Sequence, residues 1–239
     1  VVAACLAGRR AFCAQKHVGL NVAADPLYTM SYTGVNAGMV ILVADDPGMH
    51  SSQNEQDSRY HAISSKVPMI EPADSEEALE FTKIAFDISE EFDTPVIIKM
   101  CTRVAHSQSI VTTADRVVPE KTYEKNIAKY VMMPGNAKKR HPFVEERTKK
   151  LIAYSETSSL NKVFMGASDI GIITSSTSYQ YVREVFGDSV SVLKLGMVNP
   201  LPEKLIKDFA AKVKKLYVVE ELDPNRRSEE RRVGKECRS

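Results

Sequence analysis

The sequence contains no tryptophan, carries almost no net charge and has no long apolar segment. A formal net charge of +1 over 239 residues argues against the strongly basic face with which proteins bind nucleic acids. A membrane-spanning helix needs about 18 or more apolar residues in succession, and the sequence has no such run. We therefore expect neither a nucleic-acid partner nor a membrane. With 43% hydrophobic and 26% charged residues, the composition is typical of a soluble globular protein.

Cysteine is also scarce, and the common short catalytic motifs are missing. The four cysteines, Cys5, Cys13, Cys101 and Cys237, form no CxxC pair and have no zinc-type spacing to a histidine. We interpret them as free thiols in a reducing, cytoplasmic compartment. The sequence contains no GxGxxG, P-loop, GxSxG or HExxH pattern, so no single motif assigns a reaction.

Both ends of the sequence have unusual features. It begins at Val1 without methionine, signal-peptide pattern or helix cap, and we expect that an N-terminal part is missing. The last residues, Arg227 to Ser239, read RSEERRVGKECRS and could form an exposed charged tail. They also resemble the translation of a sequencing-library adapter, so we interpret residues 226–239 as a non-native tail.

Short apolar runs alternate with helical periods, which indicates parallel βαβ architecture. The runs predict a first α/β unit, a charged and proline-broken segment at 112–150, and a smaller second α/β unit. Strands are expected at 11–14, 39–44, 67–71, 96–100, 169–174, 190–195 and 216–219. Helices are expected at 18–32, 75–92 with Ser75 as cap, 143–154, 178–186 and 202–216.

Two polar segments follow strands of the first unit. DDPGMHSSQNEQDSRY, Asp45 to Tyr60, follows the strand at 39–44, and Thr102 to Ser107 follows the strand at 96–100. Ligands of parallel α/β sheets bind outside the carboxyl ends of the strands, so we expect Asp45 to Arg59 and Thr102 to His106 to face one crevice. Arg59 could bind a substrate carboxylate through two parallel hydrogen bonds. Alternatively, Ser51 and Ser52 cap a helix and Asp57 pairs with Arg59.

Three further segments have both a structural and a functional interpretation. In KHVGLN, Lys16 to Asn21, His17 could hydrogen-bond a ligand or be a satisfied structural residue. In SSTSYQ, Ser175 to Gln180, the hydroxyls could hold phosphate at a helix N-terminus or cap that helix. The basic cluster KKRH, Lys138 to His141, could contact phosphate or belong to a solvated linker.

Four stretches carry a family resemblance: KHVGLNVAADPL from Lys16, YTGVNAGMVILVADDPGMHSSQNEQDSRY from Tyr32, EPADSEEALEFTK from Glu71 and TRVAHS from Thr102. They resemble the thiamine-diphosphate-dependent 2-oxoacid:ferredoxin oxidoreductases, in particular the alpha subunits that use indolepyruvate. The resemblance is nearly continuous over Val1 to Ile110. It extends less specifically through LGMVNPLPEKLI and LYVVEELDP.

The resemblance implies a domain organisation. Residues 1–112 would form most of a pyrimidine-binding domain, residues 113–154 a linker with a helix, and residues 155–225 a transketolase C-terminal-like domain. The domain that holds the diphosphate and magnesium, and the segment that carries iron–sulfur clusters, would lie outside this sequence. A family glutamate that contacts the aminopyrimidine is expected upstream of Val1, so the catalytic residue of this chain is unknown.

The resemblance also implies a reaction: oxidative decarboxylation of an aryl pyruvate such as indolepyruvate to an aryl-acetyl-CoA, with coenzyme A as co-substrate and ferredoxin as electron acceptor. A beta subunit, ferredoxin and an oligomer of the enzyme are the implied partners. We expect the chain to be inactive alone. The alternative is a non-catalytic assembly subunit of such a complex.

The implied substrate and cofactor cleft involves twelve polar residues. They are His17, Asn21, His50, Ser51, Ser52, Gln53, Asn54, Gln56, Asp57, Arg59, Arg103 and His106. Pyruvate-using relatives place a basic residue near the end of the strand at 39–44, where this chain has Asp45 and Asp46. Recognition of the substrate carboxylate must then come from elsewhere, and Arg59 and Arg103 are the candidates.

Overall fold

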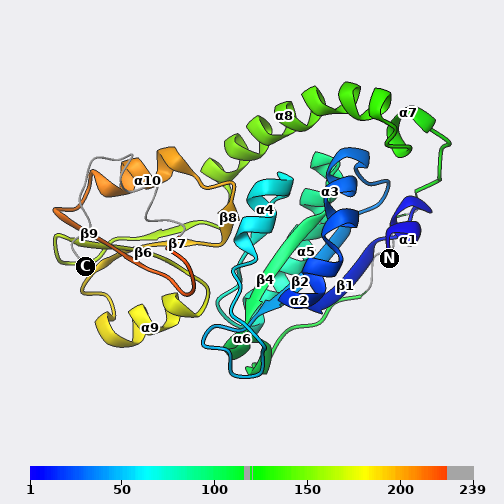
Figure 1. The fold of residues 1–239 in the computed structure, drawn as a ribbon. Helices are drawn as coiled ribbons and strands as arrows, with labels where there is room; N and C mark the ends of the chain where they lie inside the picture. The colour runs from blue at the N-terminus through cyan, green and yellow to red at the C-terminus, as the bar shows by residue number, and fades with distance from the viewer. Residues whose placement is uncertain (116–118, 120, 225–239) are drawn as a thin grey trace.

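A computed structural model describes residues 1–115, 119 and 121–224, in which the strands form two sheets (Figure 1). The first is five-stranded with the order β1-β2-β4-β3-β8, and the second is four-stranded with the order β5-β7-β6-β9. In Figure 1 the first sheet and its helices lie on the right and the second sheet on the left. The segment interpreted as a non-native tail lies outside the described residues.

The first sheet is parallel except at one edge. Strands β1 (Ala11–Lys16), β2 (Met39–Asp45), β4 (Val96–Cys101) and β3 (Met69–Ile70) pair in parallel. Strand β8 (Met197–Asn199) pairs antiparallel with β3. Strands β2 and β4 are apolar and buried along most of their length, as expected where helices cover both faces of a parallel sheet. Strand β8 comes after β7 of the second sheet in the chain. The chain therefore returns from the second sheet to the edge of the first, and then goes back to form β9.

Helices cover both faces of the first sheet. On one face, residues of α2 (His17–Val22), α3 (Ala24–Thr33) and α4 (Arg59–Ser65) pack against alternate residues of β2. On the other face, α5 (Ser75–Phe92) packs against the intervening strand residues. The short helix α1 (Val2–Leu6) precedes β1. The single helix expected at 18–32 is divided at Ala23, whose backbone leaves the helical region at φ −86° and ψ 8°.

Helix α5 has the expected bounds, but its cap is one residue earlier than expected. The Asp74 carboxylate accepts a hydrogen bond of 2.9 Å from the backbone N–H of Glu77. In return the Glu77 carboxylate accepts one of 3.0 Å from the backbone N–H of Ala73. This reciprocal arrangement is a variant of the capping box, in which Glu77 reaches the N–H of the residue before the cap. The prediction of Ser75 as cap is therefore wrong, because Asp74 supplies the acceptor and the Ser75 hydroxyl bonds to Ser107 instead.

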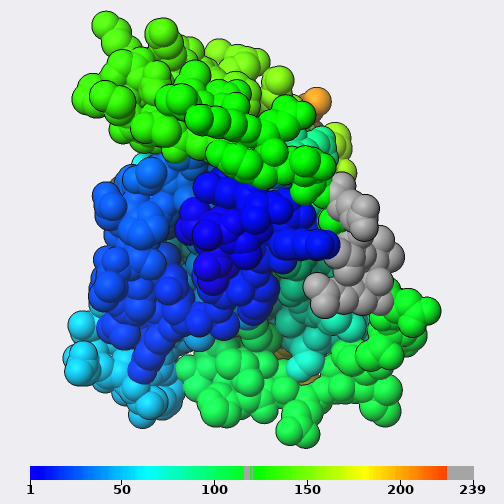
Figure 2. Space-filling view, turned by 90° about the vertical axis from the view of Figure 1, so that its right-hand side faces the viewer, coloured from blue at the N-terminus to red at the C-terminus, as the bar shows by residue number. Residues whose placement is uncertain are grey.

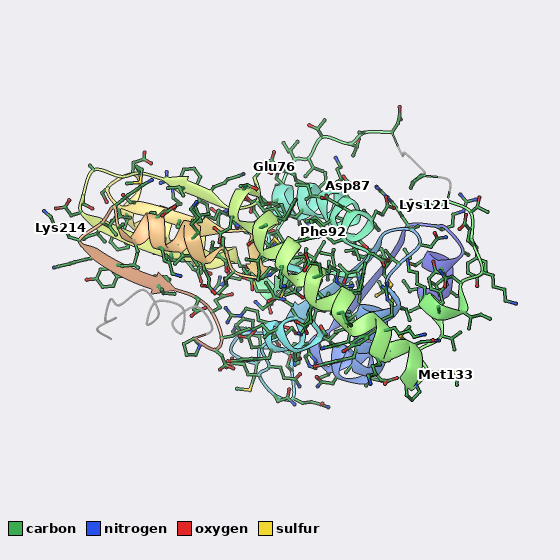
Figure 3. The ribbon with its side chains drawn as sticks, turned by 90° about the horizontal axis from the view of Figure 1, so that it is seen from above. Glu76, Asp87, Phe92, Lys121, Met133 and Lys214 are labelled. Carbon is green, nitrogen blue, oxygen red and sulfur yellow. The ribbon has the colours of Figure 1, made fainter. Side chains whose placement is uncertain are left out.

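The charged segment between the sheets forms two helices, α7 (Ile127–Tyr130) and α8 (Pro134–Thr157). Helix α8 begins earlier than expected and continues through Pro142. Figure 2 shows this segment as a ridge over the N-terminal residues. Figure 3 shows α8 from above, running from Met133 past Phe92. The Phe92 ring meets the Tyr154 ring edge-on at 5.4 Å.

Polar contacts fix α8 to α3 and to the end of α5. Arg140 pairs with Asp93 at 3.1 Å, and Arg147 donates hydrogen bonds to the Asp93 carbonyl and the Ser31 hydroxyl at 2.9 and 3.0 Å. His141 of the same helix bonds to Tyr32. Two members of the basic cluster at 138–141 thus contact protein, which favours a structural role for that cluster.

The second sheet is mostly parallel. Strand β6 (Ile170–Ser175) pairs in parallel with β7 (Ser191–Leu195) and β9 (Lys215–Val219), and β5 (Lys162–Phe164) pairs antiparallel with β7. Helices α9 (Ser176–Phe186) and α10 (Glu203–Ala210) complete this half of the chain. The helix expected at 202–216 ends at Ala210, and the short strands β5 and β8 were not expected.

The two sheets share one apolar core and several polar contacts. A single cluster of buried apolar residues includes Val43 of β2, Leu193 of β7 and Phe209 of α10. Lys194 of β7 forms a buried ion pair with Glu77 of α5. The two sheets therefore pack against each other through a shared core. The domain boundaries inferred from the resemblance stay a prediction.

The α5 face of the first sheet yields a stability prediction. Phe81 is 1% exposed in the α5 cluster, so Phe81→Ala should lower the free energy of unfolding by about 3–5 kcal/mol. Phe186→Ala, at a side chain that is 44% exposed, should cost less than about 1 kcal/mol. Urea denaturation of both variants measures the difference. Equal losses would contradict the assignment of Phe81 to the core.

Candidate functional site

The carboxyl ends of β2 and β4 open onto one cleft of about 550 Å³, a volume typical of small-molecule sites. Its lining combines the loop after β2, the helix α6 (Thr102–His106) and one residue that follows β9. The lining residues are Pro47, His50, Cys101, Thr102, Arg103, His106, Ser107 and Glu221. The prediction that the segments after the two strands face one crevice is therefore confirmed; in Figure 1, α6 lies beside the loop after β2.

Asp46 holds these two strand ends together. One carboxylate oxygen accepts hydrogen bonds from the Ser51 backbone N–H at 2.8 Å and the Ser52 hydroxyl at 2.6 Å. The other accepts one from the Thr102 hydroxyl at 2.8 Å. The bonds from Ser52 and Ser51 hold the pKa of Asp46 well below its usual range. The ionised Asp46 thus fixes the shape of the cleft wall.

Asp45 belongs instead to a buried charge network beneath the cleft. It accepts a hydrogen bond of 2.9 Å from the Ser58 backbone N–H. Burial raises the pKa of Asp45, although nearby Lys99 opposes the shift. The Lys99 ammonium lies 3.2 Å from a Glu71 oxygen. Burial disfavours its charge, yet the carboxylates of Glu71 and Asp45 raise the pKa of Lys99 overall.

Arg59 is buried at 2% exposure, with every arm of its guanidinium bonded to protein. It pairs with Asp57 at 2.5 Å and with Glu220 at 2.8 Å. It also donates to the carbonyl oxygens of Glu221 and Asp223 at 2.9 and 2.7 Å. Burial opposes its charge, but Asp57 and the neighbouring carboxylates raise the pKa of Arg59. The structure thus favours the alternative in which Asp57 pairs with Arg59.

Arg103 differs from Arg59 because it lines the cleft and is paired with no carboxylate among the described residues. Its guanidinium lies over the ring of Tyr181, from α9, at 5.5 Å. Within the described part of the chain it has no hydrogen bond or ion pair. His50 and His106 line the same cleft. Of the two arginines considered for carboxylate recognition, Arg103 is therefore the one that the geometry favours.

A second hollow of about 460 Å³ adjoins the cleft through His50. It is lined by Lys16, Val18, Met49, His50, Ser51, Ser52 and Gln53. The Lys16 ammonium donates to the Ser51 carbonyl, which ties β1 to the loop after β2. The structure thus brings together the predicted residues His50 to Gln53. Other predicted residues lie apart from these hollows: Gln56 bonds to Asn54 at 2.8 Å, and Asn21 bonds to His61 of α4 at 3.2 Å.

His17 opens α2 and is 1% exposed. Neither nitrogen of its ring has a hydrogen-bond partner among the residues that the structure describes. A buried imidazole without partners is unusual in folded proteins. The interpretation of His17 as a satisfied structural residue is therefore not supported, and its contact with a ligand stays a prediction.

The hydroxyls of the SSTSYQ segment face the first sheet. Ser175 donates to the Glu71 carboxylate, Ser176 donates to the Pro72 carbonyl at 3.3 Å, and Thr177 lies 3.4 Å from the Cys101 sulfur. Ser175 precedes α9 but makes no side-chain cap bond to it. The capping interpretation is thus wrong for Ser175, because its hydroxyl bonds across the junction between the sheets.

Sequence reasoning missed Glu221 and Cys101 as lining residues. Glu221 follows β9, and the rule that ligands collect at the carboxyl ends of strands is the signal that could have found it.

Among the described residues no group of three or more His, Cys, Asp or Glu side chains is placed to hold a metal ion. None of the described helices is long and apolar enough to cross a membrane.

The contrast between the two arginines gives a prediction. Arg59→Ala leaves the buried carboxylate of Asp57 without its ion-pair partner, and should lower the free energy of unfolding by about 3–5 kcal/mol. Arg103→Ala removes a side chain without an ion pair and should cost about 0.5 kcal/mol or less. Chemical denaturation measures both. A small loss for Arg59→Ala would mean that the buried junction contributes little to stability.

The lowered pKa of Asp46 gives a pH prediction. Its ionised form stabilises the fold above the ordinary pKa of 3.8, and this contribution is lost as pH falls through the lower pKa of the folded state. The stability advantage of the native chain over Asp46→Asn should therefore be larger at about pH 6 than at about pH 3. Urea denaturation at both pH values tests this, with Asp208→Asn on the exposed side of α10 as control. An advantage that grows toward low pH would contradict the assignment.

The sequence matches a family model and several known proteins. Residues 1–170 match the family model "Pyruvate flavodoxin/ferredoxin oxidoreductase, thiamine diP-bdg". The chain is 42% identical over 231 residues to the indolepyruvate oxidoreductase subunit IorA of Archaeoglobus fulgidus, covering 93% of this chain and 37% of that protein. The IorA subunit of Methanothermobacter thermautotrophicus is 42% identical over 229 residues, with the same coverage. The chain thus spans little more than a third of these relatives.

The fold is also that of a solved structure. The 2-oxoglutarate:ferredoxin oxidoreductase from Magnetococcus marinus, with 2-oxoglutarate, coenzyme A and succinyl-CoA bound, matches with a TM-score of 0.70 at 16% identity. The match covers 98% of this chain and 49% of that one, so it includes both sheets. The predicted fold class and the family resemblance are confirmed. The chain belongs to the thiamine-diphosphate-binding family of pyruvate flavodoxin/ferredoxin oxidoreductases.

Proposed function

We propose that this chain forms part of an enzyme that oxidatively decarboxylates an aryl pyruvate, such as indolepyruvate, to an aryl-acetyl-CoA and passes the electrons to ferredoxin. The observation that carries the proposal is a cleft at the strand ends in which Arg103 forms no ion pair among the described residues. The names of the relatives that match 93% of the chain support indolepyruvate as substrate.

Arg103 is the proposed receptor for the substrate carboxylate. A guanidinium binds a carboxylate through two parallel hydrogen bonds, and the ring of Tyr181 supports the guanidinium from the second half of the chain. His50 and His106 line the same cleft and can add donors. Asp46 holds the strand ends at fixed positions, which orients the substrate before reaction.

The residues of the adjoining hollow fit the pyrimidine end of thiamine diphosphate. Its lining offers the ammonium of Lys16, the imidazole of His50 and the hydroxyls and amide of Ser51 to Gln53, a donor and acceptor set suited to an aminopyrimidine ring. When bound, the cofactor supplies a nucleophilic carbon for the keto group and accepts the electrons of decarboxylation.

The diphosphate requires other partners. No cluster of metal-ligating side chains exists among the described residues, so the diphosphate and its magnesium would be held by another domain. Iron–sulfur clusters and the contacts with ferredoxin and the beta subunit would likewise belong to parts beyond this chain, which spans 37% of the curated relatives. Tests of the function therefore use the complete two-subunit enzyme.

The test is the kinetic effect of Arg103→Ala in that complete enzyme. Loss of a charge-assisted pair should raise the KM for indolepyruvate about tenfold or more and change the affinity for thiamine diphosphate little. Arg103→Lys should restore part of the affinity. Arg183→Ala is the control, because Arg183 of α9 does not line the cleft and pairs with Asp188 at 2.6 Å.

Two outcomes would count against the proposal in different ways. An unchanged KM for Arg103→Ala would remove Arg103 from the substrate site while leaving the reaction in place. Failure of the intact, cofactor-loaded enzyme to reduce ferredoxin with any aryl pyruvate would remove the reaction itself.

A further inference from the structure

Glu221 brings a negative charge into the same cleft from the other half of the chain. It follows β9 in the second sheet, whereas Arg103 belongs to α6 beside the first sheet. The two residues line one cleft but form no ion pair with each other. The cleft therefore presents a cation and an anion that are kept apart.

The Glu221 side chain is incompletely satisfied. Its Oε2 atom is buried and has no hydrogen-bond partner among the described residues. A buried carboxylate oxygen without a donor costs free energy. Because Oε2 is closed to solvent, a ligand donor reaches it only when the Glu221 side chain turns toward the cleft that it lines. The backbone at this point is also held firmly, because Arg59 donates to the carbonyl oxygen of Glu221 at 2.9 Å and to that of Asp223 at 2.7 Å.

We propose that Glu221 is a specificity-determining residue: its carboxylate accepts a hydrogen bond from an N–H group on the side chain of the 2-oxoacid whose own carboxylate Arg103 binds. This inference rests on the proposed function. A ligand that is anionic at one end and a hydrogen-bond donor at the other complements both fixed charges. An aryl pyruvate that has an indole N–H meets this requirement, and the cleft volume of about 550 Å³ accommodates a molecule of that size.

In this arrangement, Arg59 holds the segment that carries Glu221 in place. It is a positioning residue, because it touches the backbone of the 221–223 segment rather than the cleft. The Leu222 backbone adopts a left-handed conformation with φ 66°, which is unfavourable for a branched side chain. The bonds from Arg59 on both sides of Leu222 hold that conformation in place and with it the position of Glu221.

The experiment compares indolepyruvate with 1-methylindolepyruvate, which lacks the N–H, in the complete two-subunit enzyme. The native enzyme should show a kcat/KM about tenfold or more higher for indolepyruvate. Glu221→Met, which removes the acceptor at similar volume, should bring the ratio of the two values to within about twofold. Glu221→Gln retains an acceptor oxygen and should keep most of the preference. Glu184→Met, at an exposed position of α9, is the matched control and should leave the ratio unchanged.

A binding measurement separates recognition from turnover. The dissociation constants of indole-3-propionate and 1-methylindole-3-propionate, measured by calorimetry on the native enzyme and on Glu221→Met, should show the same preference and the same loss. Equal kcat/KM values for the two pyruvates in the native enzyme would overturn the inference, even if Glu221→Met failed to assemble. An unchanged ratio in a folded Glu221→Met enzyme would also overturn it. If the native enzyme used neither pyruvate, the proposed function itself would fail.

Discussion

The buried guanidinium of Arg59 is the contact on which the arrangement of the cleft depends. It joins α4, at the first sheet, to the segment that follows β9 in the second sheet, through Asp57, Glu220 and two backbone carbonyls. Inside a protein such a charge is tolerated only when all of its donors are satisfied. Because the same guanidinium bonds both halves, the positions of the two cleft walls are set together rather than separately.

Two adjacent aspartates at the end of β2 show how one strand end serves both the core and the cleft. Successive residues of a strand point to opposite sides, so Asp45 enters the buried network with Lys99 while Asp46 turns to the loop and to Thr102. Burial raises the pKa of the first, and hydrogen bonds lower the pKa of the second. Their pKa shifts act in opposite directions on the pH dependence of stability.

The sequence predicts the long, periodic elements and misses those that depend on distant residues. Helix α5 and strands β2 and β4 were predicted to within about one residue, because their apolar patterns are continuous. Strands β5 and β8 are three residues each, too short for a periodic signal. For the site, the strand-end rule placed His50 and Arg103 together correctly. The rule alone could not separate Arg59 from Arg103, because Glu220, which binds Arg59 in addition to the nearby Asp57, is 161 residues away in the chain.

The same separation in sequence explains why the cleft needs both halves of the chain. Arg103 comes from α6, while the ring that supports it and the carboxylate across the cleft come from α9 and the end of β9. A first sheet folded alone would present a cation at the strand ends with nothing to position it or to select among carboxylates. Addition of the second sheet supplies the aromatic support and an acceptor of opposite charge. Under the proposed function, selection among 2-oxoacids takes place at the junction of the two sheets, where the buried ion pair of Lys194 with Glu77 joins the two halves of the chain.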